Sequence, residues 1–207
     1  MRMPRRNVLR SDAPDSYYHV YARGHSKSHI FLDEHDYLYF LSLFERYLSS
    51  EEVKSSAGIS YPNFYNKIEL NAFCLMPNHF HLLIYQHQQE ALSSFMRSLM
   101  TSYSRYFNAR HSRSGALFES RFRASLISDE SYLEHISRYI HLNPRYWRDY
   151  EYSSLPYYLQ RVTVSWLRPE RILHLFSSPS EYLNFVADYV ENKKLLDILK
   201  YELADKL

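Results

Sequence analysis

Two histidines stand two residues apart at the start of an apolar run, within LMPNHFHLLIY at 75–85. In a β-strand the side chains of residues i and i+2 share one face. His79 and His81 should therefore point one way, while the apolar side chains that alternate with them, beginning with Phe80, point into a core. Two imidazoles on one rigid face could form half of a metal site. The alternative is a partly exposed strand that carries two histidines without a function.

A tyrosine and an asparagine supply groups that the histidine pair lacks. Tyr139 and Asn143, in RYIHLNP at 138–144, are four residues apart and share a face of an expected helix. A phenol is a possible nucleophile, and an amide oxygen is a possible metal ligand. Alternatively, Tyr139 packs and Asn143 caps the helix before Pro144. The residue before a proline is also biased out of helical geometry, which could turn Asn143 away.

Arginines are concentrated in one part of the chain, although the formal net charge is only +2. Residues 97–123 contain a single acid, Glu119, among six arginines. With Arg23, the candidate DNA-binding arginines are Arg97, Arg105, Arg110, Arg113, Arg121 and Arg123. Aromatic residues lie between them, as expected of a surface that follows phosphates and stacks bases. The alternative is a solvated helix face.

Length and composition restrict the class of protein. A chain of 207 residues, 45% of them hydrophobic, can bury a core as one domain with an appendage or as two small domains. No apolar run approaches the roughly 20 residues of a membrane helix, and no apolar signal-peptide core follows the basic start. The lone Cys74 excludes an internal disulfide framework. We therefore expect a cytoplasmic protein without a membrane partner.

The order of expected elements is β-α-β-β-α-β-α. The strands are expected at 17–23, 67–75, 79–85 and 118–128, and the helices at 33–50, 89–110 and 130–142. This order fits an α+β fold, with a ferredoxin-like or RRM-like antiparallel sheet and helices packed on one face. The last strand should present a basic face. Residues 1–147 would form this domain, and 148–207 a loop and helical extension with helices at 168–176 and 179–203.

Four segments together resemble the single-tyrosine HUH transposases, most closely the REP-associated tyrosine transposase (IS200-like) branch. They are LMPNHFHLLI at 75–84, YSRYFN at 103–108, GALFESRF at 115–122 and RYIHLNP at 138–144. They occur in the family's order, and the resemblance spans about residues 15–175. Two segments depart from the pattern: the usual Val-Arg-Ala after Pro144 is replaced by RYW at 145–147, and a later Trp-Ser-Ser is YSS at 152–154.

The resemblance implies a function and a set of site residues. His79 and His81 would be metal ligands, Asn143 a third ligand and Tyr139 the nucleophile. The cofactor would be a divalent metal, Mg or Mn. The partner would be single-stranded DNA with a hairpin or palindromic repeat, cleaved and rejoined through a 5′-phosphotyrosine in DNA transposition. Whether the protein is a monomer or a homodimer stays open.

Two other classes of protein remain as alternatives. A non-catalytic single-stranded nucleic-acid-binding module would also use an RRM-like sheet with aromatic and basic residues, but it gives no role to the histidines and Tyr139. A histidine-based phosphotransferase or hydrolase would use alternating histidines, but Leu83 occupies the position of a third one.

Overall fold

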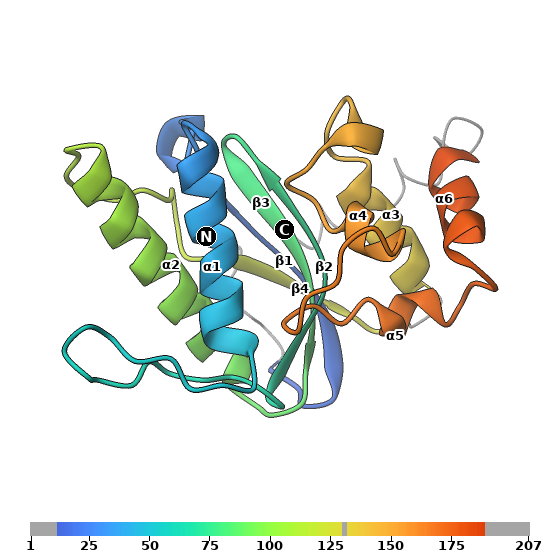
Figure 1. The fold of residues 1–207 in the computed structure, drawn as a ribbon, viewed down its shortest axis with the longest axis horizontal. Helices are drawn as coiled ribbons and strands as arrows, with labels where there is room; N and C mark the ends of the chain where they lie inside the picture. Colours follow the sequence, from blue (N-terminus) through green and yellow to red (C-terminus); the bar gives the residue numbers. More distant parts are fainter. Residues whose placement is uncertain (1–11, 130–131, 189–207) are drawn as a thin grey trace, which may run out of the picture.

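Four strands form one antiparallel sheet in the order β2-β3-β1-β4 (Figure 1). They are β1 (Ser16–Arg23), β2 (Ile68–Met76), β3 (His79–Gln86) and β4 (Arg123–Ile127). The structure, a computed structural model, describes residues 12–129 and 132–188. The order of strands and helices is the split βαβ arrangement, so the predicted α+β fold is confirmed.

Two amphipathic helices cover one face of the sheet, α1 (Glu34–Leu48) and α2 (Ala91–Arg110). Asp33 caps α1 by accepting a hydrogen bond from the backbone N–H of Asp36. The buried side chains of both helices meet Phe80 and the other inward residues of β3 in one core. Both helices were predicted, and the inward orientation of Phe80 is confirmed.

The other face of the sheet is covered by α3 (Leu133–His141) and the C-terminal extension. The extension contains α4 (Leu155–Tyr158), α5 (Glu170–Leu173) and α6 (Pro179–Ala187). Short 3-10 turns occur at His25–Lys27 and Trp147–Asp149. Figure 1 shows α1 and α2 on one side of the sheet and α3 to α6 on the other. The prediction that the helices pack on one face holds for α1 and α2 but is wrong for α3, which packs on the other face against β2 and β3. The histidines of β3 point toward this second face.

The turn between β2 and β3 is held by the backbone that follows β1. Pro77 accepts a hydrogen bond from the N–H of Ile30 at 2.7 Å, and Asn78 accepts one from the N–H of Gly24 at 2.9 Å. A Cβ added at Gly24 would lie 2.1 Å from the carbonyl oxygen of Ser28, so only glycine fits this close approach. These contacts fix the point where the histidine strand begins.

A buried hydrogen-bond network joins α3 to the C-terminal extension. The ring nitrogens of His141 lie 2.7 Å from the hydroxyl of Tyr182 and 2.6 Å from the hydroxyl of Ser154. Tyr182 also donates to Ser137, and Ser154 accepts from the backbone N–H of Phe73 in β2. The helix that carries Tyr139 is therefore fixed to both the extension and the sheet.

Acid should destabilise this arrangement through His141. Burial lowers the pKa of His141 from 6.5 to about 3. Below pH 6.5 the unfolded chain binds a proton at this histidine that the folded chain does not. The free energy of unfolding therefore decreases as the pH is lowered from 6.5 to about 3. This histidine contributes about 1.4 kcal/mol per pH unit. The His141→Gln protein should be less stable at neutral pH, but its free energy of unfolding should decrease less steeply as the pH is lowered from about 6.5 to about 5. Urea denaturation at several pH values measures this slope. Parallel slopes for the two proteins would contradict this role.

Several predicted boundaries are wrong. The strand expected at 118–128 is β4 at Arg123–Ile127, because Phe118 leaves the sheet after one bridge to Gly24 and packs in the core beneath α2. The helix expected at 168–176 is the four-residue α5. The helix expected at 179–203 is α6, and its predicted part beyond residue 188 lies outside the described residues. The helix expected from residue 130 begins at Leu133, and residues 130–131 also lie outside the described residues. No helix of the described ranges is long and apolar enough to cross a membrane.

Candidate active site

The predicted tyrosine and the predicted histidines lie together on the face of the sheet that carries α3. The rings of His79 and His81 in β3 are perpendicular, with centroids 5.1 Å apart. Tyr139 approaches from α3, and its ring centroid lies 5.5 Å from that of His81. The strict alternation of β3 and the packing of α3 on β2 and β3 produce this arrangement.

Asn143 faces His79, although it precedes a proline. The last helical turn closes with a hydrogen bond from the N–H of Leu142 to the carbonyl of Arg138, and Asn143 follows just outside the helix. Its Oδ1 lies 3.2 Å from Nε2 of His79. The other ring nitrogen of His79, Nδ1, lies 2.7 Å from Oδ1 of Asn78. Both nitrogens of His79 are thus engaged, which fixes the plane of its ring.

A third histidine, His19 of β1, lies beside His81. Nε2 of His19 is 3.0 Å from Nδ1 of His81, and the two rings are nearly parallel with centroids 5.1 Å apart. His19 also contacts the ring of Tyr139, at 5.8 Å between centroids. His19 was not predicted from the sequence as a site residue. Its alternation with Tyr21 in a short strand was visible, but the pairing of β1 with β3, in which Tyr21 stands opposite His81, was not.

Burial keeps these imidazoles neutral at physiological pH. It lowers the pKa of His19 to about 4 and holds the pKa of His81 well below its usual value. It also lowers the pKa of His79, in part offset by the hydrogen bond with Asn143. A neutral imidazole has a lone pair that a metal ion can accept.

The donor set at this site fits a divalent metal ion. Neighbouring ligands of an octahedral ion with bonds of about 2.1 Å lie about 3 Å apart, close to the 3.2 Å between His79 and Asn143. In the described ranges no group of three or more His, Cys, Asp or Glu side chains is arranged to hold a metal. The predicted donors are instead the imidazoles of His79 and His81 and the amide oxygen of Asn143, and His19 adds a third imidazole beside His81.

The phenol of Tyr139 is protonated at neutral pH. Burial raises its pKa above the ordinary value of 10, and hydrogen bonding with the side chain of Asn143 partly opposes this rise. The hydroxyl can act as a nucleophile only if its proton is removed during the reaction. A group or solvent molecule that accepts the proton is therefore part of any mechanism here.

Residues 13–143 match the family model described as "Transposase IS200 like". The chain belongs to the IS200-like transposase family. The matched range contains both β3 histidines and Tyr139, and Asn143 is its last residue. No curated protein matches the chain.

Among solved structures, this IS200-like transposase resembles a REP-associated tyrosine transposase bound to a REP hairpin. The sequence identity is 15% and the TM-score 0.52, and the match covers 78% of this chain and 90% of the other. At this identity the likeness shows the fold, and it agrees with the four-stranded sheet described above.

Two of the seven predicted DNA-binding arginines lie at the site of this transposase. Arg23 stands opposite His79 in the pairing of β1 with β3, and its charge adds to the effect of burial in lowering the pKa of His79. Arg123 donates a hydrogen bond to the hydroxyl of Tyr21 at 3.1 Å, and its guanidinium lies over that ring. Both place positive charge at the edge of the histidine face, and Glu119 lies 4.0 Å from the guanidinium of Arg123.

The other five predicted arginines lie away from the histidines. Arg97, Arg105 and Arg121 line a cavity beside α2. Arg110 is paired with Asp33 and Asp36 at 2.7 and 2.9 Å, so its charge is largely neutralised. Arg113 lies over the ring of Phe107. The prediction that Arg121 and Arg123 share one strand face is wrong, because β4 begins only at Arg123.

Proposed function

We propose that this transposase cleaves and rejoins single-stranded DNA at hairpin-forming repeats through a 5′-phosphotyrosine on Tyr139. One observation carries the proposal: the phenol of Tyr139, carried by α3, lies beside two neutral histidines and an amide on one face of the sheet. Membership in the family and the hairpin bound by the similar solved structure support DNA as the partner. A binding module alone would leave this arrangement without a role.

Tyr139 acts as the nucleophile in this proposal. Its phenolic oxygen attacks the phosphorus of a phosphodiester, the bond from phosphorus to the 3′ oxygen breaks, and the departing oxygen takes up a proton. The phenol loses its own proton to water or a neighbouring base, and its contact with Asn143 eases that loss. The product is a 5′-phosphotyrosine and a free 3′-OH. Attack by another 3′-OH reverses the step and joins strands without ATP, because each step exchanges one ester bond for another.

His79, His81 and Asn143 would hold a divalent ion, Mg or Mn. When bound, such an ion polarises the scissile phosphate and offsets the charge that develops in the transition state. The protein's own contribution is to hold the donors in place: Asn78 orients the ring of His79, and His19 orients the ring of His81. Arg23 adds a fixed positive charge beside them, suited to the DNA backbone.

Incubation of end-labelled single-stranded hairpins with the protein and Mg or Mn tests this proposal. A covalent protein–DNA adduct supports the tyrosine transposase mechanism. Cleavage without an adduct would instead indicate a hydrolase, and binding without cleavage would indicate a nucleic-acid-binding module.

DNA binding should weaken steeply with salt. If about five arginines each neutralise a phosphate of a single strand, the logarithm of the affinity falls with a slope of about −3.5 against the logarithm of salt concentration. A fourfold rise in salt should then reduce affinity about 100-fold. Arg121→Gln should make the slope shallower by about 0.7. Arg161 is an exposed arginine of the C-terminal extension, and Arg161→Gln should leave the slope unchanged. Fluorescence anisotropy measures both, and a flat response would show that these arginines do not contact DNA.

A further inference from the structure

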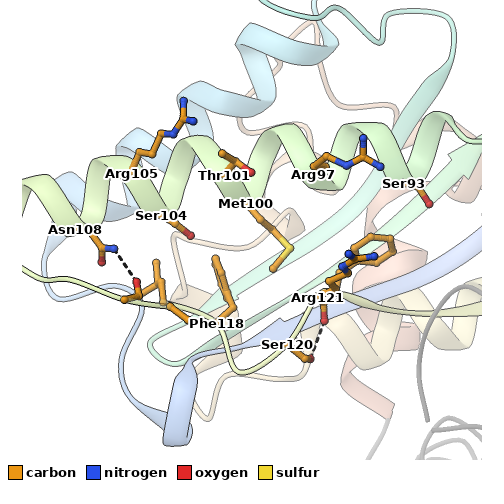
Figure 2. Close-up of a pocket in the computed structure, with 14 residues that line it drawn as sticks. Ser93, Arg97, Met100, Thr101, Ser104, Arg105, Asn108, Phe118, Ser120 and Arg121 are labelled. Carbon is orange, nitrogen blue, oxygen red and sulfur yellow. Dashed lines mark hydrogen bonds between the residues drawn. The ribbon is translucent and has the colours of Figure 1, made fainter. Parts of the chain in front are cut away.

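A cavity of about 680 Å³ lies between α2 and the segment of residues 115–122, away from the histidines. Figure 2 shows Met100 and Ser104 pointing from α2 toward this segment, which carries Phe118. Phe118 makes one isolated bridge to Gly24 and packs in the core, so this segment is not part of β4. The volume lies within the range of pockets that bind small organic groups.

The cavity combines an apolar wall with polar groups. Phe118 is held against Phe80 and Tyr103 in the core, with ring centroids 6.0 and 6.5 Å away. Met100 lies beside it at the cavity wall and is also packed against the core. Asn108 donates its amide to the carbonyl of Gly115, but its Oδ1 is buried and has no hydrogen-bond partner in the described part of the chain. A buried acceptor left unpaired is costly, and Asn108 is one of the polar residues that line the cavity.

Positive charge surrounds the same cavity. Arg97, Arg105 and Arg121 line it, and all three are exposed. None of them has a carboxylate within ion-pair distance among residues 12–129 and 132–188, in contrast to Arg110. Unpaired guanidinium groups beside an apolar wall favour a ligand that is both anionic and flat.

We propose that this cavity binds one unstacked nucleotide of the single-stranded DNA, with the base against Met100 and Phe118 and the neighbouring phosphates on the arginines. This inference rests on the proposed function. It adds a second contact on the DNA, separate from the site of cleavage. A base has a flat apolar face for the wall, and stacking of this kind does not require a particular sequence.

The structure connects this cavity to the active site along the backbone. Glu119, in the segment that borders the cavity, donates its N–H to the carbonyl of Arg23 at 3.0 Å. Four residues on, Arg123 reaches Tyr21, which stands opposite His81. Positive side chains thus follow the sheet edge from Arg121 to the histidine face. A DNA strand on this path would have one nucleotide anchored in the cavity while another part meets Tyr139.

The test compares two probes that carry the same phosphates: an oligothymidine and an abasic oligonucleotide of equal length. Tyr139→Phe serves as the background, so that no cleavage interferes. The background protein should bind the oligothymidine about tenfold more tightly than the abasic strand. Adding Ser104→Trp, which fills the space between α2 and the 115–122 segment, should remove this preference while affinity for the abasic strand remains. Arg97→Ala should weaken both probes equally, and Arg161→Ala should weaken neither.

A preference for bases that persists in the Ser104→Trp protein would overturn the proposal, provided that its thermal unfolding matches that of the background protein. If this variant does not fold, photocrosslinking of a thiothymidine oligonucleotide to the unsubstituted chain decides instead. Crosslinks in peptides from α2 or residues 115–122 support the cavity, and crosslinks confined to other peptides exclude it. If the cavity does not bind a base, Tyr139 can still form the adduct. If no hairpin gives an adduct, the proposed function is wrong, but the preference for bases can still be measured.

Discussion

Tyr139→Phe should bind hairpin DNA as tightly as the unsubstituted chain and form no covalent adduct with it. The substitution removes only the phenolic oxygen, and the ring that packs against His81 and His19 remains. Folding and DNA affinity should therefore be preserved, while the attacking atom is lost. Denaturing gel electrophoresis of labelled DNA after incubation with Mg or Mn measures the adduct, and anisotropy measures the affinity.

Two other tyrosines provide matched controls for this result. The hydroxyl of Tyr103 donates to the carbonyl of Ile30 inside the core, and that of Tyr106 donates to the carbonyl of His35. Both hydroxyls have structural roles on the far face of the sheet, so Tyr103→Phe and Tyr106→Phe should still form the adduct. An adduct that survives in Tyr139→Phe, or that disappears in Tyr106→Phe, would show that the nucleophile is another residue.

His81→Ala should reduce metal-dependent cleavage by on the order of 100-fold or more, because loss of a ligand removes much of the charge stabilisation that a bound ion supplies. Binding of hairpin DNA should change little, since the side chain is almost completely buried and the candidate DNA-binding arginines are left unchanged. The initial rate of cleavage, measured over a range of Mg or Mn concentrations, gives the effect.

An exposed histidine of the C-terminal extension serves as the control for this second substitution. His174→Ala should cleave at the rate of the unsubstituted chain, because His174 is exposed and its ring bonds locally, to the carbonyl of Glu170 four residues before it. If His81→Ala also cleaves at an unchanged rate, the assignment of His81 as a metal ligand is wrong.

Strict local periodicity explains which features the sequence could predict. The two-residue repeat of a strand fixed which face His79 and His81 occupy. The four-residue spacing predicted that Tyr139 and Asn143 share a helical face, and the two side chains do lie near one another although Asn143 follows the end of α3. The structure adds that Asn143 keeps its contact with His79 even though Pro144 follows. The helix ends at His141, one residue before its predicted end at residue 142. Asn143 therefore needs no helical backbone to reach β3, and the proline after it does not turn it away.

Features that depend on long-range pairing could not be predicted in this way. His19 became a neighbour of His81 only through the register between β1 and β3, which short sequence patterns do not specify. The alternation of apolar and basic residues at 118–128 suggested one long strand, yet Phe118 is buried under α2 and only residues 123–127 pair with β1. Tertiary packing therefore separated Arg121 from Arg123 and created the cavity beside α2.

Mass spectrometry of the DNA-linked peptide tests the central claim most directly. The unsubstituted protein is incubated with Mg or Mn and a panel of single-stranded hairpins, digested with nuclease and protease, and searched for peptides that carry a nucleotide. We expect one modified peptide from α3, with the phosphate of a 5′-nucleotide esterified to Tyr139. A nucleotide linked to any other residue, or hairpin cleavage that leaves no linked peptide, would contradict the account.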